Sequence, residues 1–151
     1  MPPPPAHLLQ SIRDAVARGA PEAVLPLAPR LFELASEHLE VGEADFELRR
    51  VDFPPAHDTG VHDHSTWSLD VLLQGSLELT EYEVLSRPSP DEIEIAVRRR
   101  RVLQARSTFL VHPGDLHRVV ALTAAATLHV GGVPTVSQQY RRAGLTYRPA
   151  P

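Results

Sequence analysis

The chain has 151 residues, of which 42% are hydrophobic and 23% charged, and its formal net charge is -4 with histidine counted as neutral. This size and balance fit one soluble globular domain, and the charge provides no general attraction for nucleic acid or an anionic membrane surface. The absence of cysteine excludes disulfides, thiolate metal sites and a cysteine nucleophile. Fifteen prolines argue against a helical bundle, because a proline inside a helix breaks it.

Residues 1–40 are expected to form a proline-rich tail and short helices that pack on the rest of the chain. Apolar residues recur at helical spacing over 8–16, and Gly19 marks the expected end of that helix. Over 21–39, Pro26 and Pro29 predict either two short helices or one that begins near Pro29. No apolar run approaches the length of a membrane span. The Met-Pro-Pro-Pro-Pro start lacks the features of a secretory signal, so a cytoplasmic location is expected.

From residue 46 onwards the hydrophobic pattern alternates with a period of two, which is typical of strands. Residues 46–53 are predicted to form the first strand, which Pro54 and Pro55 close. A loop is predicted at 86–91. The other predicted strands are 67–73, 76–85, 93–97, 102–103, 107–111, 116–122 and 125–130. This order predicts that residues 41–151 form an all-β sandwich or barrel, with the whole chain as one domain.

Two histidines lie two residues apart in Gly60-Val-His62-Asp-His64, and a third, His117, follows a Pro-Gly-Asp turn. On extended chain, residues i and i+2 point to the same face. His62 and His64 can therefore direct two imidazoles at one point, while Asp63 faces the other way. Since His117 belongs to another strand, it can complete a metal site of three nitrogen ligands.

His129 is expected to face the same interior. If 116–122 and 125–130 form a hairpin centred on Thr123, then His117 and His129 lie directly opposite each other and share a face. Each buried imidazole needs hydrogen-bond partners, so four histidines on one face favour a binding role over simple filling of the core.

These motifs resemble those of the cupin superfamily. Gly60-Val-His62-Asp-His64 with Gly75 is similar to the first cupin motif, and Pro113-Gly114-Asp115-Leu116-His117 is similar to the second with one residue fewer between proline and glycine. More narrowly, His-Asp-His-Ser-Thr-Trp, Leu-Leu-Gln-Gly, Leu-His-Arg-Val and Thr-Leu-His-Val resemble the thiol dioxygenase branch, which contains cysteine dioxygenase and 3-mercaptopropionate dioxygenase. This likeness covers roughly residues 45–142.

The resemblance implies a double-stranded β-helix, a small jelly-roll barrel, with short helices at its N-terminus. It implies that His62, His64 and His117 hold Fe(II), and that the protein oxidises a small thiol acid to its sulfinate with O₂. His129 matches a histidine behind the ligands, which orients or protonates the substrate, and Thr127 matches a hydrogen-bonded serine of the family. Asp70 lies near the position of a general cupin carboxylate and is a less favoured fourth ligand.

The residues that would hold the substrate depart from the family pattern. Gly131 occupies the position of a family tyrosine, and Tyr140 and Tyr82 are the candidates to replace that tyrosine in space. The resemblance places the arginine that pairs with the substrate carboxylate at Arg141 or Arg142, with Arg118 and Arg50 as weaker candidates. In a cupin, Trp67 would line the cavity mouth.

Two other functions stay open at this point. One is a non-catalytic cupin that binds a metal or small ligand as a sensor or storage module. The other is an isomerase or hydrolase that uses zinc, nickel or manganese at the same histidines, since imidazole suits several metals. Analogy with other cupins predicts a homodimer. The run of arginines over 98–101 is expected to form a solvated edge or a subunit contact rather than a nucleic-acid site.

Overall fold

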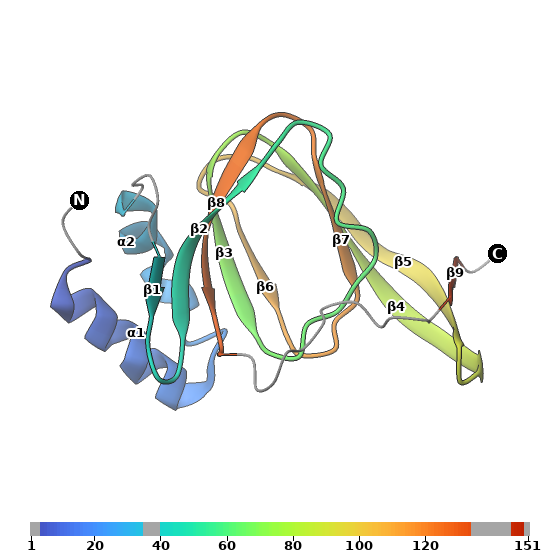
Figure 1. Cartoon of the computed structure of the whole chain (residues 1–151), viewed down its shortest axis with the longest axis horizontal. Helices are drawn as coiled ribbons and strands as arrows, with labels where there is room; N and C mark the ends of the chain where they lie inside the picture. Colours follow the sequence, from blue (N-terminus) through green and yellow to red (C-terminus); the bar gives the residue numbers. More distant parts are fainter. Residues whose placement is uncertain (1–3, 35–39, 134–145, 150–151) are drawn as a thin grey trace.

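A computed structural model describes residues 4–34, 40–133 and 146–149 of the chain. Two β-sheets face each other, with a short helical segment on one side (Figure 1). The helices are α1 (Ala6–Gly19), η1 (Leu25–Leu27, a 3-10 helix) and α2 (Ala28–Glu33). The five-stranded sheet has the order β1 (Glu40–Gly42), β2 (Glu47–Phe53), β8 (Ala125–Gly131), β3 (Ser68–Gln74), β6 (Thr108–Val111). The four-stranded sheet has the order β7 (His117–Ala121), β4 (Leu77–Ser89), β5 (Glu92–Leu103), β9 (Thr146–Pro149).

The helical segment covers the outer face of the five-stranded sheet (Figure 1). Leu8, Ile12 and Ala15 lie on one face of α1 and pack in one cluster with Leu48 and Leu69 of the sheet. Burial of each large side chain in that cluster stabilises the fold by about 1.5–3 kcal/mol. The helical N-terminus is confirmed, including its interruption near the prolines. Within the described residues, no helix combines the length and apolar character needed to cross a membrane.

The second cluster of buried apolar residues fills one end of the space between the two sheets. Leu72 and Phe109 from the five-stranded sheet meet Leu77, Leu79 and Val119 from the four-stranded sheet. Strand alternation explains why there are two clusters, because successive residues of β3 point alternately to the helices and to the barrel interior. All seven residues of β8 are buried, since this strand is covered on both faces.

Strands β4 and β5 form one long hairpin. Because β5 is continuous from Glu92 to Leu103, the prediction of separate strands over 93–97 and 102–103 was wrong. The predicted loop at 86–91 is also shorter, because pairing continues to Ser89 and Glu92. β4 pairs with β7 only as far as Glu81. Pro88 lies beyond that point, where one edge of β4 has no described ladder partner. A residue without a backbone N–H is tolerated at such an edge.

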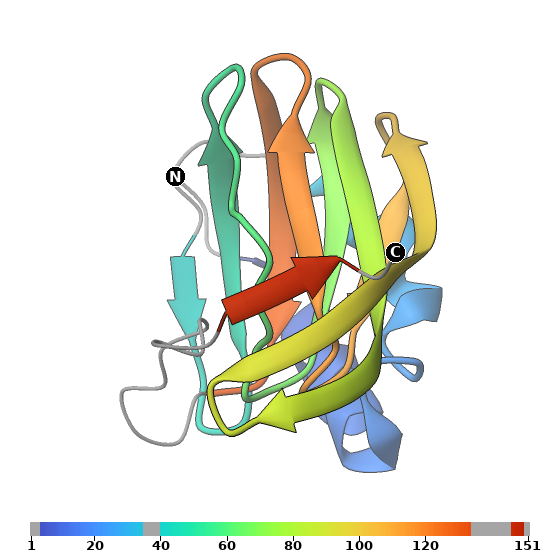
Figure 2. The ribbon, with the colours of Figure 1, turned by 90° about the vertical axis from the view of Figure 1, so that its right-hand side faces the viewer.

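The predicted hairpin between 116–122 and 125–130 was wrong. β7 pairs with β4, whereas β8 pairs with β2 and β3 in the opposite sheet (Figure 2). The turn between them carries the chain from one sheet to the other, and the Thr123 hydroxyl accepts a hydrogen bond from the Ser76 backbone N–H at 3.0 Å. Gly75, with a φ of +81°, packs so closely there that a Cβ would lie 2.2 Å from the carbonyl oxygen of Ala124. Alternation alone could not predict which sheet each strand joins.

Candidate metal centre

His62 and His117 form an isolated antiparallel bridge between the loop before β3 and the start of β7. Each backbone N–H donates to the carbonyl of the other residue at 3.0 Å. Directly opposite residues in such a pair project their side chains to one face. The two imidazole centroids are therefore only 4.2 Å apart.

His64 completes a cluster of three imidazoles. Its ring centroid lies 5.0 Å from that of His62 and 4.9 Å from that of His117, and one ligand atom from each of the three residues lies within 4.8 Å of the others. The His64 carbonyl accepts a hydrogen bond from the Gly114 N–H at 3.0 Å. This bond ties the His62–His64 segment to the Pro-Gly-Asp turn, so the two sequence motifs form one unit.

Two of the rings are held in a defined tautomer by backbone carbonyls. Nδ1 of His62 donates to the Gly60 carbonyl, and Nδ1 of His117 donates to the Asp115 carbonyl, both at 2.9 Å. In a neutral ring the remaining Nε2 then carries a lone pair, which is how ligating histidines are usually oriented. Nε2 of His62 lies 3.1 Å from Nε2 of His64. Two metal–imidazole bonds of about 2.1 Å at ordinary angles need a separation of about 3.0–3.4 Å, so the three residues could hold a divalent metal ion.

The electrostatics of the cluster favour neutral rings. Burial, followed by the nearby His117 and His62, lowers the pKa of His64 to about 3. Burial, followed by His62, lowers the pKa of His117 to about 4. Metal ligation requires neutral imidazole, so protons compete with a metal for His64 and His117 only in acid.

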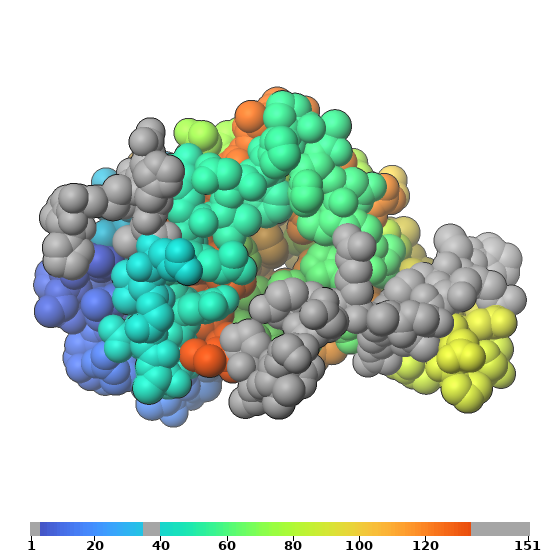
Figure 3. All heavy atoms as spheres, in the orientation of Figure 1, coloured from blue at the N-terminus to red at the C-terminus, as the bar shows by residue number. Residues whose placement is uncertain are grey.

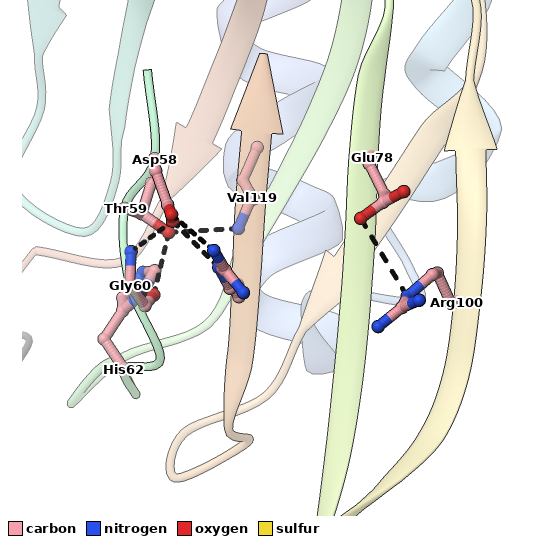
Figure 4. Close-up of polar contacts among 8 residues, drawn as sticks. Asp58, Thr59, Gly60, His62, Glu78, Arg100 and Val119 are labelled. Atoms are coloured by element: carbon pink, nitrogen blue, oxygen red, sulfur yellow. Dashed lines mark hydrogen bonds and ion pairs between the residues drawn. The ribbon is translucent and has the colours of Figure 1, made fainter. Parts of the chain in front are cut away.

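The loop before His62 is fixed to β7 by polar contacts (Figure 4). Asp58 accepts hydrogen bonds from the Gly60 N–H and from Nε of Arg118, both at 2.9 Å. The Thr59 hydroxyl accepts one from the Val119 N–H at 3.0 Å. Gly60 has a φ of +67°, in the left-handed region where glycine carries no steric cost. These contacts position the carbonyl that orients the His62 ring.

The three histidines face a small cavity between the sheets. It has a volume of about 140 Å³, and an outer cavity of about 250 Å³ shares Arg49, Thr59, His62, His64 and His129 with it. On the face shown in Figure 3, the segment 54–66 lies beside β2. At about 30 Å³ for each water molecule, the inner volume matches roughly four or five waters. Only a small molecule fits beside the histidines.

Three polar side chains form a row across the wall that belongs to the five-stranded sheet. His129 on β8 is the ladder partner of Arg49 on β2 and of Asp70 on β3. Nδ1 of His129 lies 3.2 Å from both carboxylate oxygens of Asp70, and its Nε2 lies 3.5 Å from Oε1 of Glu47. The Thr127 hydroxyl donates to Oδ1 of Asp70 at 3.1 Å.

His129 is surrounded by acceptors on both sides. Burial lowers the pKa of His129, but the charge and hydrogen bond of Asp70 and then the hydrogen bond from Glu47 raise it more, to about 9. Because a carboxylate can only accept, both ring nitrogens carry protons and His129 is an imidazolium at neutral pH. The cavity thus has neutral imidazoles on one wall and cationic groups, His129 and Arg49, on the other.

Neither a family model nor a curated protein matches the sequence. Among solved structures, the chain is similar to KdgF from Halomonas sp., with a TM-score of 0.50 and 18% identity over 66% of this chain and 79% of that one. The Schizosaccharomyces pombe Cnp3 cupin domain has a TM-score of 0.49 and 14% identity, and the match covers 66% of this chain but only 61% of that one. A cupin superfamily protein from Desulfitobacterium hafniense has a TM-score of 0.49 and 12% identity over 69% and 88% of the two chains. At these identities the likeness concerns the fold.

The chain has the cupin fold. The predicted all-β jelly-roll barrel with N-terminal helices is confirmed. In this cupin barrel the predicted ligands His62, His64 and His117 come together, and His129 faces the same cavity, although from the opposite sheet rather than from a hairpin partner. Asp63 is buried and is not among the residues that line either cavity.

Other predicted site residues have mixed positions in the cupin barrel. Trp67 lines the outer cavity. Thr127 is fully buried and bonds to Asp70, so its contact with the cavity is indirect. Arg141 and Arg142 lie outside the described residues, as does Tyr140. The weaker candidates are engaged elsewhere: Arg50 pairs with Asp52, Arg118 with Asp58, and Tyr82 packs against a separate apolar cluster.

Sequence reasoning missed Arg49 and Glu47, and it considered Asp70 only as a ligand. The signal was present in the alternation of β2, where buried Leu48 faces the helices and the odd-numbered residues therefore face the cavity. Gly131 is also explained by the structure. A Cβ at this position would lie 2.6 Å from Nε2 of His129, so the ring uses the space that a side chain would need.

Proposed function

We propose that this protein is a mononuclear Fe(II) oxygenase of the thiol dioxygenase type, with His62, His64 and His117 as the metal ligands. The observation that carries the proposal is the set of convergent imidazoles, two of them oriented by carbonyls, at a cavity that also presents cationic groups. Bound Fe(II) would supply open coordination positions for a small anionic ligand and O₂ together. The net reaction adds both oxygen atoms of O₂ to the thiol sulfur and yields a sulfinic acid.

Arg49 is proposed to pair with the carboxylate of the substrate. Arg49 lines both the inner and the outer cavity, its side chain is 42% exposed, and its Nε lies 3.5 Å from Oε1 of Glu47. Guanidinium–carboxylate pairs are directional and strong when partly buried. In this proposal Arg49 has the role that the resemblance gave to Arg141 or Arg142.

Nε2 of His129 is proposed to donate a hydrogen bond to the bound substrate in place of its longer, 3.5 Å contact with Glu47. Asp70 holds the ring, and Thr127 in turn holds Asp70. A fixed donor of this kind stabilises negative charge in the cavity without reorganisation. Asp70 lines the inner cavity but acts in this proposal by orienting the His129 ring, and Thr127, which lines neither cavity, orients Asp70, so both are positioning residues.

A non-catalytic cupin is the second candidate, and one observation favours it. Gly131 occupies the position of the family tyrosine, and the His129 ring leaves no room there for a side chain. A site without that tyrosine can still bind a metal and a small acid as a sensor. In such a protein the three histidines and Arg49 would keep their binding roles.

Oxygen uptake discriminates between the two functions. Protein purified without chelators is analysed for metal, loaded with Fe(II), and assayed with cysteine, 3-mercaptopropionate and cysteamine. The oxygenase proposal predicts uptake of one O₂ for each sulfinate formed, with the carboxylates preferred over cysteamine. Saturable binding of these thiols without oxygen uptake would support the sensor instead.

A further inference from the structure

Three arginines of the run 98–101 face a second cleft, which residues of β4, β5 and β6 line. The cleft has a volume of about 550 Å³, and its lining includes Arg98, Arg99, Arg101, Thr108, His112 and Asp115. Of the residues that line the histidine cavities, only Phe109 also lines this cleft. In a regular strand, by contrast, these arginines would alternate between the two faces.

A β-bulge explains why the arginines gather on one side. The ladder pairs Glu81 with Arg99 but pairs the next residue, Tyr82, with Val97, so Arg98 is the extra residue. A bulge of this kind bends the strand and redirects a side chain. Arg98 and Arg99 therefore both reach Glu81, at 3.7 Å and 2.8 Å. Arg101 pairs with Leu79, whose side chain is in the core, and so it points inward beside Arg99.

Arg101 has a buried hydrogen-bond donor that is unpaired among the described residues. Its Nε is fully buried and has no hydrogen-bond partner there. Burial, and then the charge of Arg99, lower the pKa of Arg101, and Glu81 only partly opposes them. A buried charged donor without an acceptor is costly, so a bound acceptor would be favoured at this point.

The acidic groups near the cleft already have partners. Glu81 accepts from two arginines. Asp115 accepts from the His112 backbone N–H at 3.2 Å, and the His112 ring pairs with Glu22. Among the residues that line the cleft there are three guanidinium groups and two carboxylates, Glu81 and Asp115, which leaves an excess of positive charge in the lining.

We propose that this cleft binds the phosphate group of a small molecule. Guanidinium groups match two oxygens of a tetrahedral oxyanion with paired N–H donors, and the Thr108 hydroxyl supplies a further donor on the facing strand. The site is separate from the histidine cavity. Occupation of the cleft therefore does not require a metal at His62, His64 and His117.

Calorimetric titration of the full chain with inorganic phosphate, and with sulfate as a second tetrahedral anion, tests the proposal. Wild-type protein is expected to bind phosphate saturably. Arg101→Met keeps the length of the side chain but removes its donors, and is expected to weaken binding by roughly ten-fold or more. Arg100→Met is the matched control, because Arg100 is outside the cleft and lies 3.9 Å from Glu78 (Figure 4).

The variants are first compared by circular dichroism in phosphate-free buffer. If Arg101→Met does not fold, phosphate binding is measured with Arg99→Met instead, because the Arg99 side chain is 56% exposed and its replacement disturbs the fold less. Equal binding by the cleft variant and Arg100→Met would overturn the proposal, as would the absence of saturable binding to wild-type protein. A dimer in gel filtration that the cleft variant dissociates would also overturn it, since a second copy would then cover the arginines. Loss of phosphate binding in His117→Ala would contradict the separation of the two sites.

Discussion

The backbone bridge between His62 and His117 brings the two sequence motifs together. The residues are 55 positions apart, yet they exchange both backbone hydrogen bonds at 3.0 Å, and their rings lie 4.2 Å apart between centroids. The imidazole positions are therefore set by main-chain geometry, with Gly60 and Asp115 fixing the ring orientations. A site preorganised in this way loses little entropy when a ligand binds.

Gly131→Ala is predicted to disturb His129 while leaving the three ligands in place. The added Cβ would lie 2.6 Å from Nε2 of His129, so the ring must move away from Glu47 or Asp70. Thiol-dependent oxygen uptake should fall by roughly ten- to hundred-fold, as expected for the loss of one hydrogen bond to a charged group, and metal content should not change. Gly42→Ala is the control, because a Cβ at that position meets nothing within 4 Å. Unchanged oxygen uptake in Gly131→Ala would show that the placement of His129 does not matter.

Asp70→Asn is predicted to lower the pKa of His129. Since the folded-state pKa of about 9 lies above the ordinary value of about 6.5, His129 contributes stability that is full below pH 6.5 and is lost as the pH rises through 9. Removal of the Asp70 charge should abolish most of that alkaline loss. NMR titration of the His129 ring and urea unfolding at pH 6 and pH 9.5 measure the two effects. An Asp70→Asn protein that loses stability in alkali as wild type does would contradict this assignment.

His64 and His117 are predicted to release no protons when a metal binds between pH 7 and 5. The pKa values of His64 and His117, about 3 and about 4, mean that both rings are already neutral in this range. In the metal-free protein, unfolded histidines take up protons below about pH 6.5 while these two do not. Stability without metal should therefore fall as the pH is lowered from 6.5 through 3. Metal titrations at pH 5, 6 and 7 provide the check, and release of more than one proton for each metal bound at pH 6 would contradict the prediction.

Arg49→Met is predicted to weaken use of a carboxylate substrate. It removes a charged partner from the cavity, so kcat/KM for 3-mercaptopropionate should fall by roughly ten- to hundred-fold, while cysteamine, which has no carboxylate, should be affected little. Arg50→Met is the matched control, because Arg50 neighbours Arg49 but pairs with Asp52 on the other face of β2. Equal losses with the two thiols would mean that Arg49 does not recognise the carboxylate.

Much of the fold could be predicted from short-range sequence patterns. The alternation over 46–53 and the turn at Gly75 correspond to β2 and to the β3–β4 turn of the structure. The three candidate ligands were identified because a two-residue spacing has one geometric meaning on extended chain. His64 and His62 indeed lie with Nε2 atoms 3.1 Å apart.

Pairing between distant strands was beyond that reasoning. Counting around Thr123 placed His117 opposite His129, but His117 pairs with His62 and Glu81, and His129 pairs with Asp70 and Arg49. A strand that crosses to the other sheet after a tight turn has the same alternation as one that folds back. The Asp70–His129 pair and the Arg98 bulge were hidden for this reason, since each depends on which strand lies alongside.

Metal content of the purified protein tests the three-histidine centre most directly. Wild-type protein loaded anaerobically with Fe(II) and desalted should retain one metal ion for each chain, and His62→Ala and His117→Ala should retain almost none. His7→Ala serves as the control, since His7 is exposed on α1. Full metal content in His62→Ala and His117→Ala, with His7→Ala unchanged, would contradict the assignment of these histidines as ligands.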